Sequence, residues 1–136
     1  MWTFEQATGK LYSKSGVCVA QGYAGGNCGK NPGGKNNPKM QGVKGVGPLP
    51  QGIYTLGTPV LQSKLGPFAI PLLPDKTNVM FGRGDFFCHG DTTPPGNASE
   101  GCIIMPRAIR NDMIASGERI TVVAVYTPNV SALETA

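Results

Sequence analysis

One histidine and one glycine-flanked cysteine are the residues of this chain whose types and spacing could do chemistry. His89 is the only histidine in 136 residues, and Cys102 lies 13 residues after it, behind the small-residue turn 98–101. A cysteine is a nucleophile as its thiolate, and a neighbouring imidazole is the usual base that generates it at neutral pH. The pair is therefore the smallest set of side chains that could carry out acyl transfer.

Each member of this pair also has a structural interpretation. An isolated cysteine is commonly a small buried residue, and a single histidine is often held by backbone groups at a strand end. The neighbours of Cys102 favour catalysis, because Gly101 has no side chain to obstruct a substrate and the run 103–105 is apolar. On such a turn the N–H groups of Gly101 and Cys102 could point at a substrate oxyanion.

A zinc site is the competing use of Cys88, His89, Asp91 and Cys102. Structural zinc favours ligand pairs at short spacing such as C-x2-C, and the chain has no such pair. Adjacent residues of a strand point to opposite faces, so Cys88 and His89 cannot readily share one ion. We therefore expect neither a metal nor another cofactor.

Several polar residues have two possible roles each. Asp91 either orients His89 or caps the Thr-Thr-Pro-Pro turn that follows it, and its residue type favours the cap. Arg83, Arg107 and Arg110 could bind a substrate carboxylate in forked geometry, although each is expected to be a solvated surface charge. Cys18 and Cys28 lie in one glycine-rich region, and the spacing leaves open whether they form a disulfide.

Composition limits the class of protein. Twenty Gly and 12 Pro favour short strands joined by tight turns. The net charge of +4 suits an anionic partner, which could be cell-wall polymer, nucleic acid or membrane. The scattered Lys and Arg, without interleaved aromatic residues, argue against nucleic acid. No apolar run is long enough for a membrane span, and the N-terminus lacks the features of a Sec signal.

The turn and alternation signals predict a mainly β domain over 1–136 with one short helix. Strands are predicted in a hairpin over 2–12 and over 16–23, 52–56, 66–73, 86–89 and 119–126. Pro71 places its strand at an edge or a bulge. Residues 24–39 are predicted to be a flexible glycine-rich loop, and 127–136 a loose tail.

The helix is predicted over 106–116, with Pro106 in its first turn and Gly117 as the stop. Its expected apolar stripe is Ile109, Met113 and Ile114, and its expected polar face is Arg107, Arg110 and Asp112.

The motif His89-Gly90 followed by Ser99-Glu100-Gly101-Cys102 resembles the signature of L,D-transpeptidases of the YkuD type, which is His-Gly, a loop, then Ser/Thr-His-Gly-Cys. The chain is most similar to the divergent, DUF2778-like branch of L,D-transpeptidase/carboxypeptidase effectors that type VI secretion systems deliver. The segments that carry this resemblance are 34–41, 47–55, 80–83, 89–91, 98–104 and 106–107, and the likeness runs from Trp2 to Val125.

The resemblance implies a β-sandwich with its site in a groove over one sheet. The Cys102 thiolate, with His89 as base and then acid, would attack the diaminopimelate carbonyl of a peptidoglycan tetrapeptide stem and expel D-alanine. Water would complete an L,D-carboxypeptidase reaction, a D-amino acid would give exchange, and a second stem a cross-link. The Gly101 and Cys102 N–H groups would hold the oxyanion. The further orienting or substrate-binding candidates are Ser99, Gly90, Asp91, Arg83 and Arg107.

The same resemblance implies peptidoglycan stem peptides, an immunity protein and the secretion apparatus as partners. It implies secretion without a Sec signal and action in the periplasm of a target bacterium. The chain departs from the typical pattern at Glu100, where a histidine is usual, and at Ile104, where an arginine is often found and Arg107 is the candidate replacement.

Two other functions fit the sequence less well. A non-catalytic wall-binding module on the same fold would not need the intact pair of His89 and Cys102. Papain-like and NlpC/P60-type endopeptidases place the cysteine before the histidine, whereas this chain has the opposite order.

Overall fold

Ten short strands carry most of the regular structure in the computed structural model, which describes residues 1–128. The strands are β1 (Trp2–Glu5), β2 (Lys10–Tyr12), β3 (Cys18–Gln21), β4 (Tyr23–Ala24), β5 (Gly52–Leu56), β6 (Val60–Gln62), β7 (Gly66–Pro74), β8 (Phe87–His89), β9 (Ile103–Ile104) and β10 (Ile120–Val123). One α-helix, α1 (Arg107–Ser116), is found in this part of the chain. The mainly β class with one short helix after Cys102 is confirmed.

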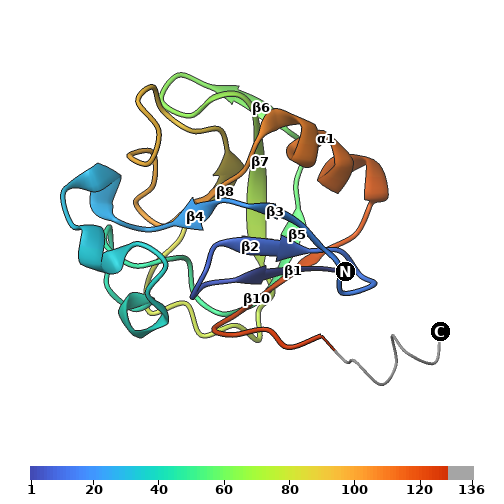
Figure 1. Ribbon diagram of the computed structural model, residues 1–136, viewed down its shortest axis with the longest axis horizontal. Helices are drawn as coiled ribbons and strands as arrows, with labels where there is room; N and C mark the ends of the chain where they lie inside the picture. The colour runs from blue at the N-terminus through green and yellow to red at the C-terminus, as the bar shows by residue number, and fades with distance from the viewer. Residues whose placement is uncertain (129–136) are drawn as a thin grey trace.

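The strands form one curved sheet in which the hydrogen-bonded order is β3-β2-β1-β10-β5-β7-β8-β9-β4, with β6 paired to β7. β3 and β4 stand at opposite ends of this order, yet only Gly22 separates them in the chain. The sheet therefore curls until its ends meet, and in Figure 1 β3 continues into β4 as one blue ribbon.

Gly22 is the residue at which the sheet closes. A Cβ atom there would lie 1.7 Å from the Ile104 carbonyl oxygen, so no side chain fits. The Gly22 N–H donates to the Gly9 carbonyl at 2.8 Å. The close approach of the Gly22 backbone to Ile104 and Gly9 joins the two halves of the sheet around the core.

The segments near the two ends of the chain meet in the middle of the sheet. β1 pairs in parallel with β10, from Trp2 opposite Ile120 to Glu5 opposite Val123. β10 also pairs with β5, and β1 with β2 as the predicted hairpin. β10 ends at Val123, three residues earlier than predicted.

The sequence predicted that Pro71 places its strand at an edge or a bulge, and the edge is wrong because β7 lies inside the sheet between β5 and β8. On one side of β7 the partner changes from β5, where Leu56 faces Leu72, to β6, where Val60 faces Ala69. Pro71 lies at this change, and its carbonyl accepts the Gly57 N–H at 2.8 Å. The missing proline N–H therefore falls where the ladder is already interrupted.

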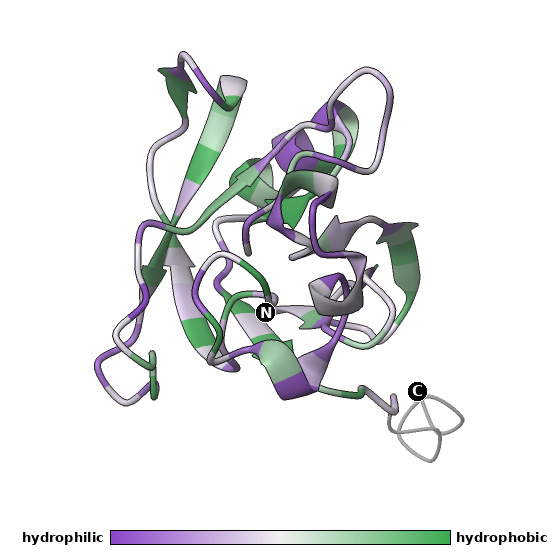
Figure 2. Ribbon diagram, turned by 90° about the vertical axis from the view of Figure 1, so that its left-hand side faces the viewer, coloured by the Kyte–Doolittle hydropathy of each residue, from purple (hydrophilic) through white to green (hydrophobic). Residues whose placement is uncertain are grey.

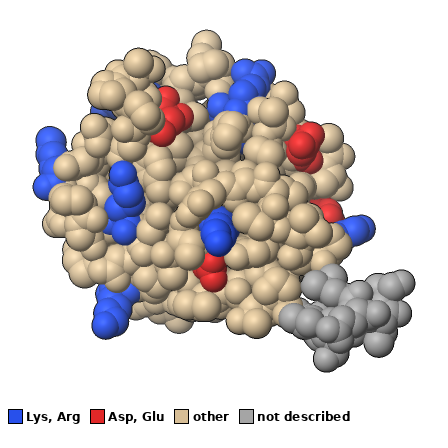
Figure 3. Space-filling model, in the orientation of Figure 1, with Lys and Arg blue, Asp and Glu red and all other residues tan. Residues whose placement is uncertain are grey.

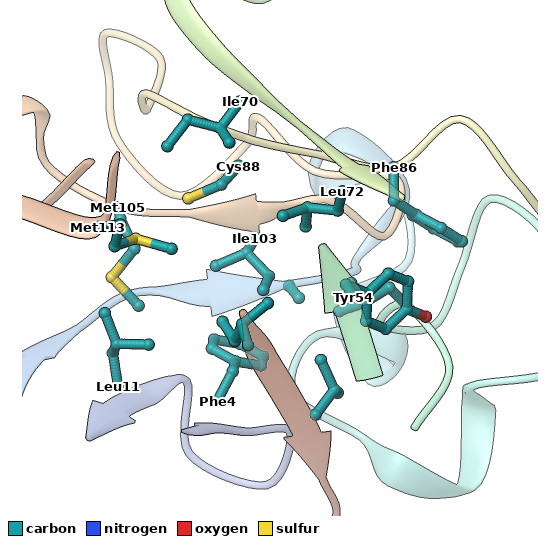
Figure 4. Packing of buried hydrophobic residues seen from close by; sticks show 14 residues of the cluster. Phe4, Leu11, Tyr54, Ile70, Leu72, Phe86, Cys88, Ile103, Met105 and Met113 are labelled. Carbon is teal, nitrogen blue, oxygen red and sulfur yellow. The ribbon is translucent and has the colours of Figure 1, made fainter. Parts of the chain in front are cut away.

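The core fills the space inside the curved sheet. Buried side chains from eight strands and from α1 converge there, and Figure 4 shows how those it labels pack together. They include Phe4, Leu11, Tyr54, Ile70, Leu72, Cys88, Ile103, Met105 and Met113. Hydrophobic and hydrophilic bands alternate along several strands in Figure 2, as expected of strands with one face against a core.

The glycine-rich segment 24–39 holds short helical turns and hydrogen bonds to the rest of the chain. The 3-10 turns are η1 (Asn27–Gly29), η2 (Pro32–Gly34) and η3 (Pro38–Met40), the last of which extends to the residue after the segment. The Cys28 N–H donates to the Ser99 carbonyl at 3.0 Å, which joins η1 to the turn before Cys102. The flexibility of segment 24–39 remains a prediction. Residues 129–136 of the predicted tail lie outside the described residues.

The helix follows the sequence signals closely. Pro106 is the residue before its first turn, and Gly117 closes it with φ 67°, a left-handed conformation that favours glycine. None of the described helices has the length and apolarity that crossing a membrane requires.

Candidate active site

The parallel pairing of β8 with β9 brings His89 and Cys102 onto one face of the sheet. Cys88 lies opposite Ile103, and His89 opposite Ile104. Cys88 and Ile103 are fully buried and belong to the core. Because side chains alternate along a strand, Phe87, His89 and Cys102 take the other face. The Phe87 N–H donates to the Cys102 sulfur at 3.4 Å, which fixes the thiol beside β8.

Two cavities meet at Cys102. His89 and Cys102 both line one of about 480 Å³, and Cys102 also lines a neighbouring cavity of about 240 Å³. Asp85 and Glu100 line both cavities. The half-buried Cys102 side chain therefore borders both cavities.

His89 is 2 % exposed, and its protonation is fixed by one contact. Its Nδ1 lies 2.9 Å from the Gly90 carbonyl oxygen. A carbonyl can only accept, so Nδ1 carries the proton and Nε2 has a lone pair. Nε2 is buried and has no hydrogen-bond partner within residues 1–128. Burial, together with the nearby Arg110 charge, lowers the pKa of His89, so the imidazole is neutral and free to accept a proton.

The thiol of Cys102 is also neutral at rest. Burial and, to a smaller extent, the Glu100 carboxylate raise its pKa to about 11. The Phe87 N–H, the Arg83 charge and the N–H of Cys102 itself act in the opposite direction. The geometry thus favours transfer of the thiol proton during attack over a thiolate that exists beforehand.

Ser99 organises the turn before the cysteine. This hydroxyl is 1 % exposed, donates to the Cys102 carbonyl at 2.6 Å, and accepts the Gly25 N–H at 2.8 Å. It also accepts the Gly101 N–H at 3.0 Å. The Gly101 N–H, one of the two groups expected to bind an oxyanion, therefore already donates a hydrogen bond to Ser99. The Cys102 N–H lies against its own sulfur, and the Phe87 N–H approaches the same atom.

Arg83 is buried, so the expectation of a solvated surface charge is wrong. Its guanidinium donates to the carbonyls of Gln41 at 2.5 Å, Pro48 at 2.9 Å, Gly47 at 3.0 Å and Glu100 at 3.2 Å. These contacts join three loops beside Cys102. Arg83 positions the site, and its donors are used within the protein.

Arg110 is 6 % exposed and likewise departs from the expected polar face. It donates to the carbonyls of Met105 at 3.1 Å, Pro67 at 3.1 Å and Phe68 at 2.7 Å. Arg107 is exposed, as expected, with its guanidinium carbon 4.3 Å from the centre of the Phe68 ring.

Asp91 accepts hydrogen bonds from the loop that separates His89 from Cys102. Its carboxylate accepts the N–H groups of Thr92 at 2.8 Å and Gly96 at 3.0 Å, and the Tyr23 hydroxyl at 2.5 Å. Among the described residues Asp91 forms no hydrogen bond with His89, although its charge raises the pKa of His89, so the structure agrees with the cap that its residue type favoured. Asp91, Gly90 and Arg107 line a separate cavity of about 520 Å³.

A family model for the Tlde1 domain matches residues 22–128. The chain belongs to the Tlde1 domain family. This is an L,D-transpeptidase-like family of type VI secretion effectors. Searches of curated proteins and of solved structures found no significant match. The Tlde1 match includes His89, Cys102 and every loop that lines the two cavities at the thiol. The narrower, DUF2778-like assignment remains a prediction.

The zinc alternative finds no support in the geometry of this Tlde1 domain. Cys88 is fully buried on the core side of β8, away from His89, and burial raises the pKa of its thiol to about 12. No cluster of three or more His, Cys, Asp or Glu that could hold a metal ion occurs in residues 1–128. Cys18 and Cys28 are both free and exposed thiols.

Three residues of the Tlde1 site were missed in the sequence. Phe87 shares a face with His89 at the strand period of two, so alternation alone could have identified it. Asp85 and Cys28 line cavities at Cys102, but Asp85 lies in an irregular loop and Cys28 in the short turn η1, where no periodic signal places a side chain.

Proposed function

We propose that this protein is a cysteine-dependent L,D-carboxypeptidase and L,D-transpeptidase that cleaves the bond between diaminopimelate and D-alanine in peptidoglycan tetrapeptide stems. One observation carries the proposal: the unpartnered Nε2 of His89 and the Cys102 thiol line one cavity, on one face of β8 and β9. Membership of the Tlde1 family supports it.

The chemistry starts from a neutral pair. His89 Nε2 accepts the thiol proton as Sγ attacks the diaminopimelate carbonyl carbon, and the carbonyl oxygen becomes an oxyanion. The tetrahedral intermediate collapses, the C–N bond breaks, and Nε2–H returns its proton to the amino group of D-alanine. A thioester of the shortened stem remains on Cys102. Water then gives the tripeptide, and an amino group gives exchange or a cross-link.

The oxyanion donors follow from the turn geometry. Gly101 would have to release Ser99 before its N–H could reach an oxyanion, whereas the Cys102 N–H already lies beside the sulfur. The contacts therefore support Cys102, more than Gly101, as the donor.

Mass spectrometry of tetrapeptide muropeptides tests the assignment. The protein should convert them to tripeptides, and an added D-amino acid should also give the exchanged stem. Cys102→Ala should release no D-alanine. Cys18→Ala is the matched control, because Cys18 is an exposed thiol outside both cavities, and it should retain full activity. Undiminished release by Cys102→Ala would reject the catalytic role.

The same experiment decides the alternative of a non-catalytic module on the same fold. The raised pKa of the Cys102 thiol is compatible with this alternative, because a binding module could carry a neutral thiol as well. A module would bind stem peptides and release no D-alanine in any variant.

The site of action is proposed to be the periplasm of a target bacterium, with an immunity protein as the partner that protects the producer. Expression in a bacterium with a periplasmic signal should stop growth, and expression without one should not. The exported Cys102→Ala variant should be harmless. Equal harm from the cytoplasm would contradict a wall target.

A further inference from the structure

The cavity of about 520 Å³ shares no lining residue with the two cavities that meet at Cys102. Arg107 and Arg110 of α1 line it, about one helical turn apart, together with Gly90 and Asp91. The steps proposed for the reaction at Cys102 use neither arginine. This cavity is therefore a separate feature of the molecule.

Arg110 is a buried charge without a counter-ion in the described chain. Its side chain is 6 % exposed, and the one ion pair found in residues 1–128 joins the N-terminus to Glu118. Nε and Nη1 of Arg110 donate to carbonyl groups, whereas Nη2 has no acceptor among these residues. A Cβ atom at Gly90 would lie 3.0 Å from Nη2, so the glycine leaves this nitrogen open to the cavity. A buried guanidinium with a free donor is costly unless a ligand completes it.

Phe68 contacts both arginines from a strained backbone conformation. Its φ is 56°, in the left-handed region that is rare for a bulky residue. Its carbonyl accepts Arg110 Nη1 at 2.7 Å, and the centre of its ring lies 4.3 Å from the guanidinium carbon of Arg107. One residue thus positions both guanidinium groups beside the cavity.

The charges around the cavity favour a ligand with a single negative charge. Burial, together with the Arg107 charge, lowers the pKa of Arg110, as expected of two cations held close together. Asp91 is the one acidic residue in the lining, and its carboxylate accepts the Tyr23 hydroxyl and two backbone N–H groups. The first turn of α1, which no side chain caps, begins at the same cavity and favours an anion. Two arginines and one aspartate leave an excess of about one positive charge, which a carboxylate neutralises.

We propose that this cavity binds the carboxylate group of an amino acid or of a peptide end, with Arg110 Nη2 and the Arg107 guanidinium as donors. The N–H groups of arginine match the two oxygens of a carboxylate. The volume of about 520 Å³ leaves room for the residues attached to that carboxylate. Because the site is separate from the cavities at Cys102, the inference goes beyond the proposed function and does not depend on it.

Calorimetry with the unmodified protein tests the class of ligand. N-acetyl-D-alanine should bind at least about 10-fold more tightly than N-acetyl-D-alaninamide, which lacks the charge. Inorganic phosphate should bind less tightly than N-acetyl-D-alanine, because its second charge exceeds the excess of the site. D-alanine is the probe for a free amino acid, and N-acetyl-D-alanine represents a peptide end. The tighter of these two carboxylates identifies the source of the ligand.

Two variants test the donors. Arg107→Gln replaces an exposed side chain, so the fold is preserved, and should weaken binding of N-acetyl-D-alanine about 10-fold. Arg110→Lys keeps the charge and loses the forked donors, and should weaken it by about the same factor. Lys64→Gln is the matched control, because it removes an exposed positive charge from the larger cavity at Cys102. It should leave the affinity unchanged.

The imidazole of His89 reports on the same event, because it is the only histidine of the chain. The Arg110 charge lowers the pKa of His89, and the Asp91 charge raises it. A carboxylate bound to Arg110 offsets the positive charge, so the pKa of His89 should rise. NMR titration of the imidazole should show this rise at saturating N-acetyl-D-alanine and no change with the amide.

Equal affinity for the acid and the amide, or tighter binding of phosphate than of the acid, would overturn the inference. So would a loss of affinity in Lys64→Gln without one in Arg107→Gln, because the carboxylate would then lie in the cavity at Cys102. An unchanged pKa of His89 at saturation would also contradict binding at Arg110. None of these measurements requires turnover, so a failure to release D-alanine contradicts the proposed function alone.

Discussion

His89 and Cys102 form a neutral pair, and each member is kept neutral by its surroundings. Burial stabilises the uncharged imidazole and the uncharged thiol alike. The single hydrogen bond from Nδ1 to Gly90 selects the tautomer in which Nε2 is the base. At the scale of residues, the site is thus prepared for one proton transfer that begins when a substrate arrives.

The pH dependence of kcat/KM follows from this state. His89 must be neutral to act as base, and its pKa lies below the ordinary value of 6.5. Activity should therefore be more than half-maximal at pH 6.5, and should fall to half at a lower pH, as the pH drops through the lowered pKa of His89. The measurement is D-alanine release between pH 4.5 and 8. An acid limb centred at or above pH 6.5 would contradict a buried neutral base.

At the scale of elements, the loops around Cys102 depend on a single guanidinium. Arg83 supplies the hydrogen bonds that four carbonyls require, and it connects the segments that carry Gln41, Pro48 and Glu100. Buried carbonyl groups that lose their donors destabilise a fold, because water cannot replace the donor.

Arg83→Met should lower the free energy of unfolding by about 2–4 kcal/mol and abolish D-alanine release. The matched control is Arg119→Met, an exposed arginine, which should change stability by less than about 0.5 kcal/mol. Urea denaturation and the muropeptide assay measure the two effects. An Arg83→Met variant with unchanged stability would show that these contacts are dispensable.

The elements with periodic or stop signals were predictable from the sequence. The β-branched run within 119–126 identified β10, and Pro106 with Gly117 bounded α1 to within one residue. The position of Pro71 was not predictable, because it depends on which strands pair with β7. His89 and Cys102 could be identified as site residues from their residue types. The burial of Arg83 could not be predicted, because it depends on carbonyl groups that only the tertiary fold brings together.

At the scale of the whole molecule, the sheet closes on itself around the core. On the face that Figure 3 shows, the blue side chains of Lys and Arg stand apart from one another, with isolated red ones between them. Closure depends on the backbone contact of Gly22 with Ile104, which brings β4 beside β9.

Gly22→Ala should therefore destabilise the protein by about 3 kcal/mol or more, because the new Cβ atom would overlap backbone that cannot move alone. Gly33→Ala is the control: its nearest neighbour is an Asn31 side-chain oxygen at 3.6 Å, which is ordinary contact. Thermal unfolding of the two variants gives the comparison. Similar melting temperatures would mean that the sheet does not need close approach at Gly22.

The pairing of β1 with β10 has a consequence for synthesis. The ribosome makes His89 and Cys102 before it makes residues 120–123, yet β10 is the strand that joins β1 to β5. A nascent chain that already contains both reactive residues still lacks the middle of its sheet. Such non-local pairing forms late in folding. We therefore expect the geometry around His89 and Cys102 to form only after residues 120–123 have been made.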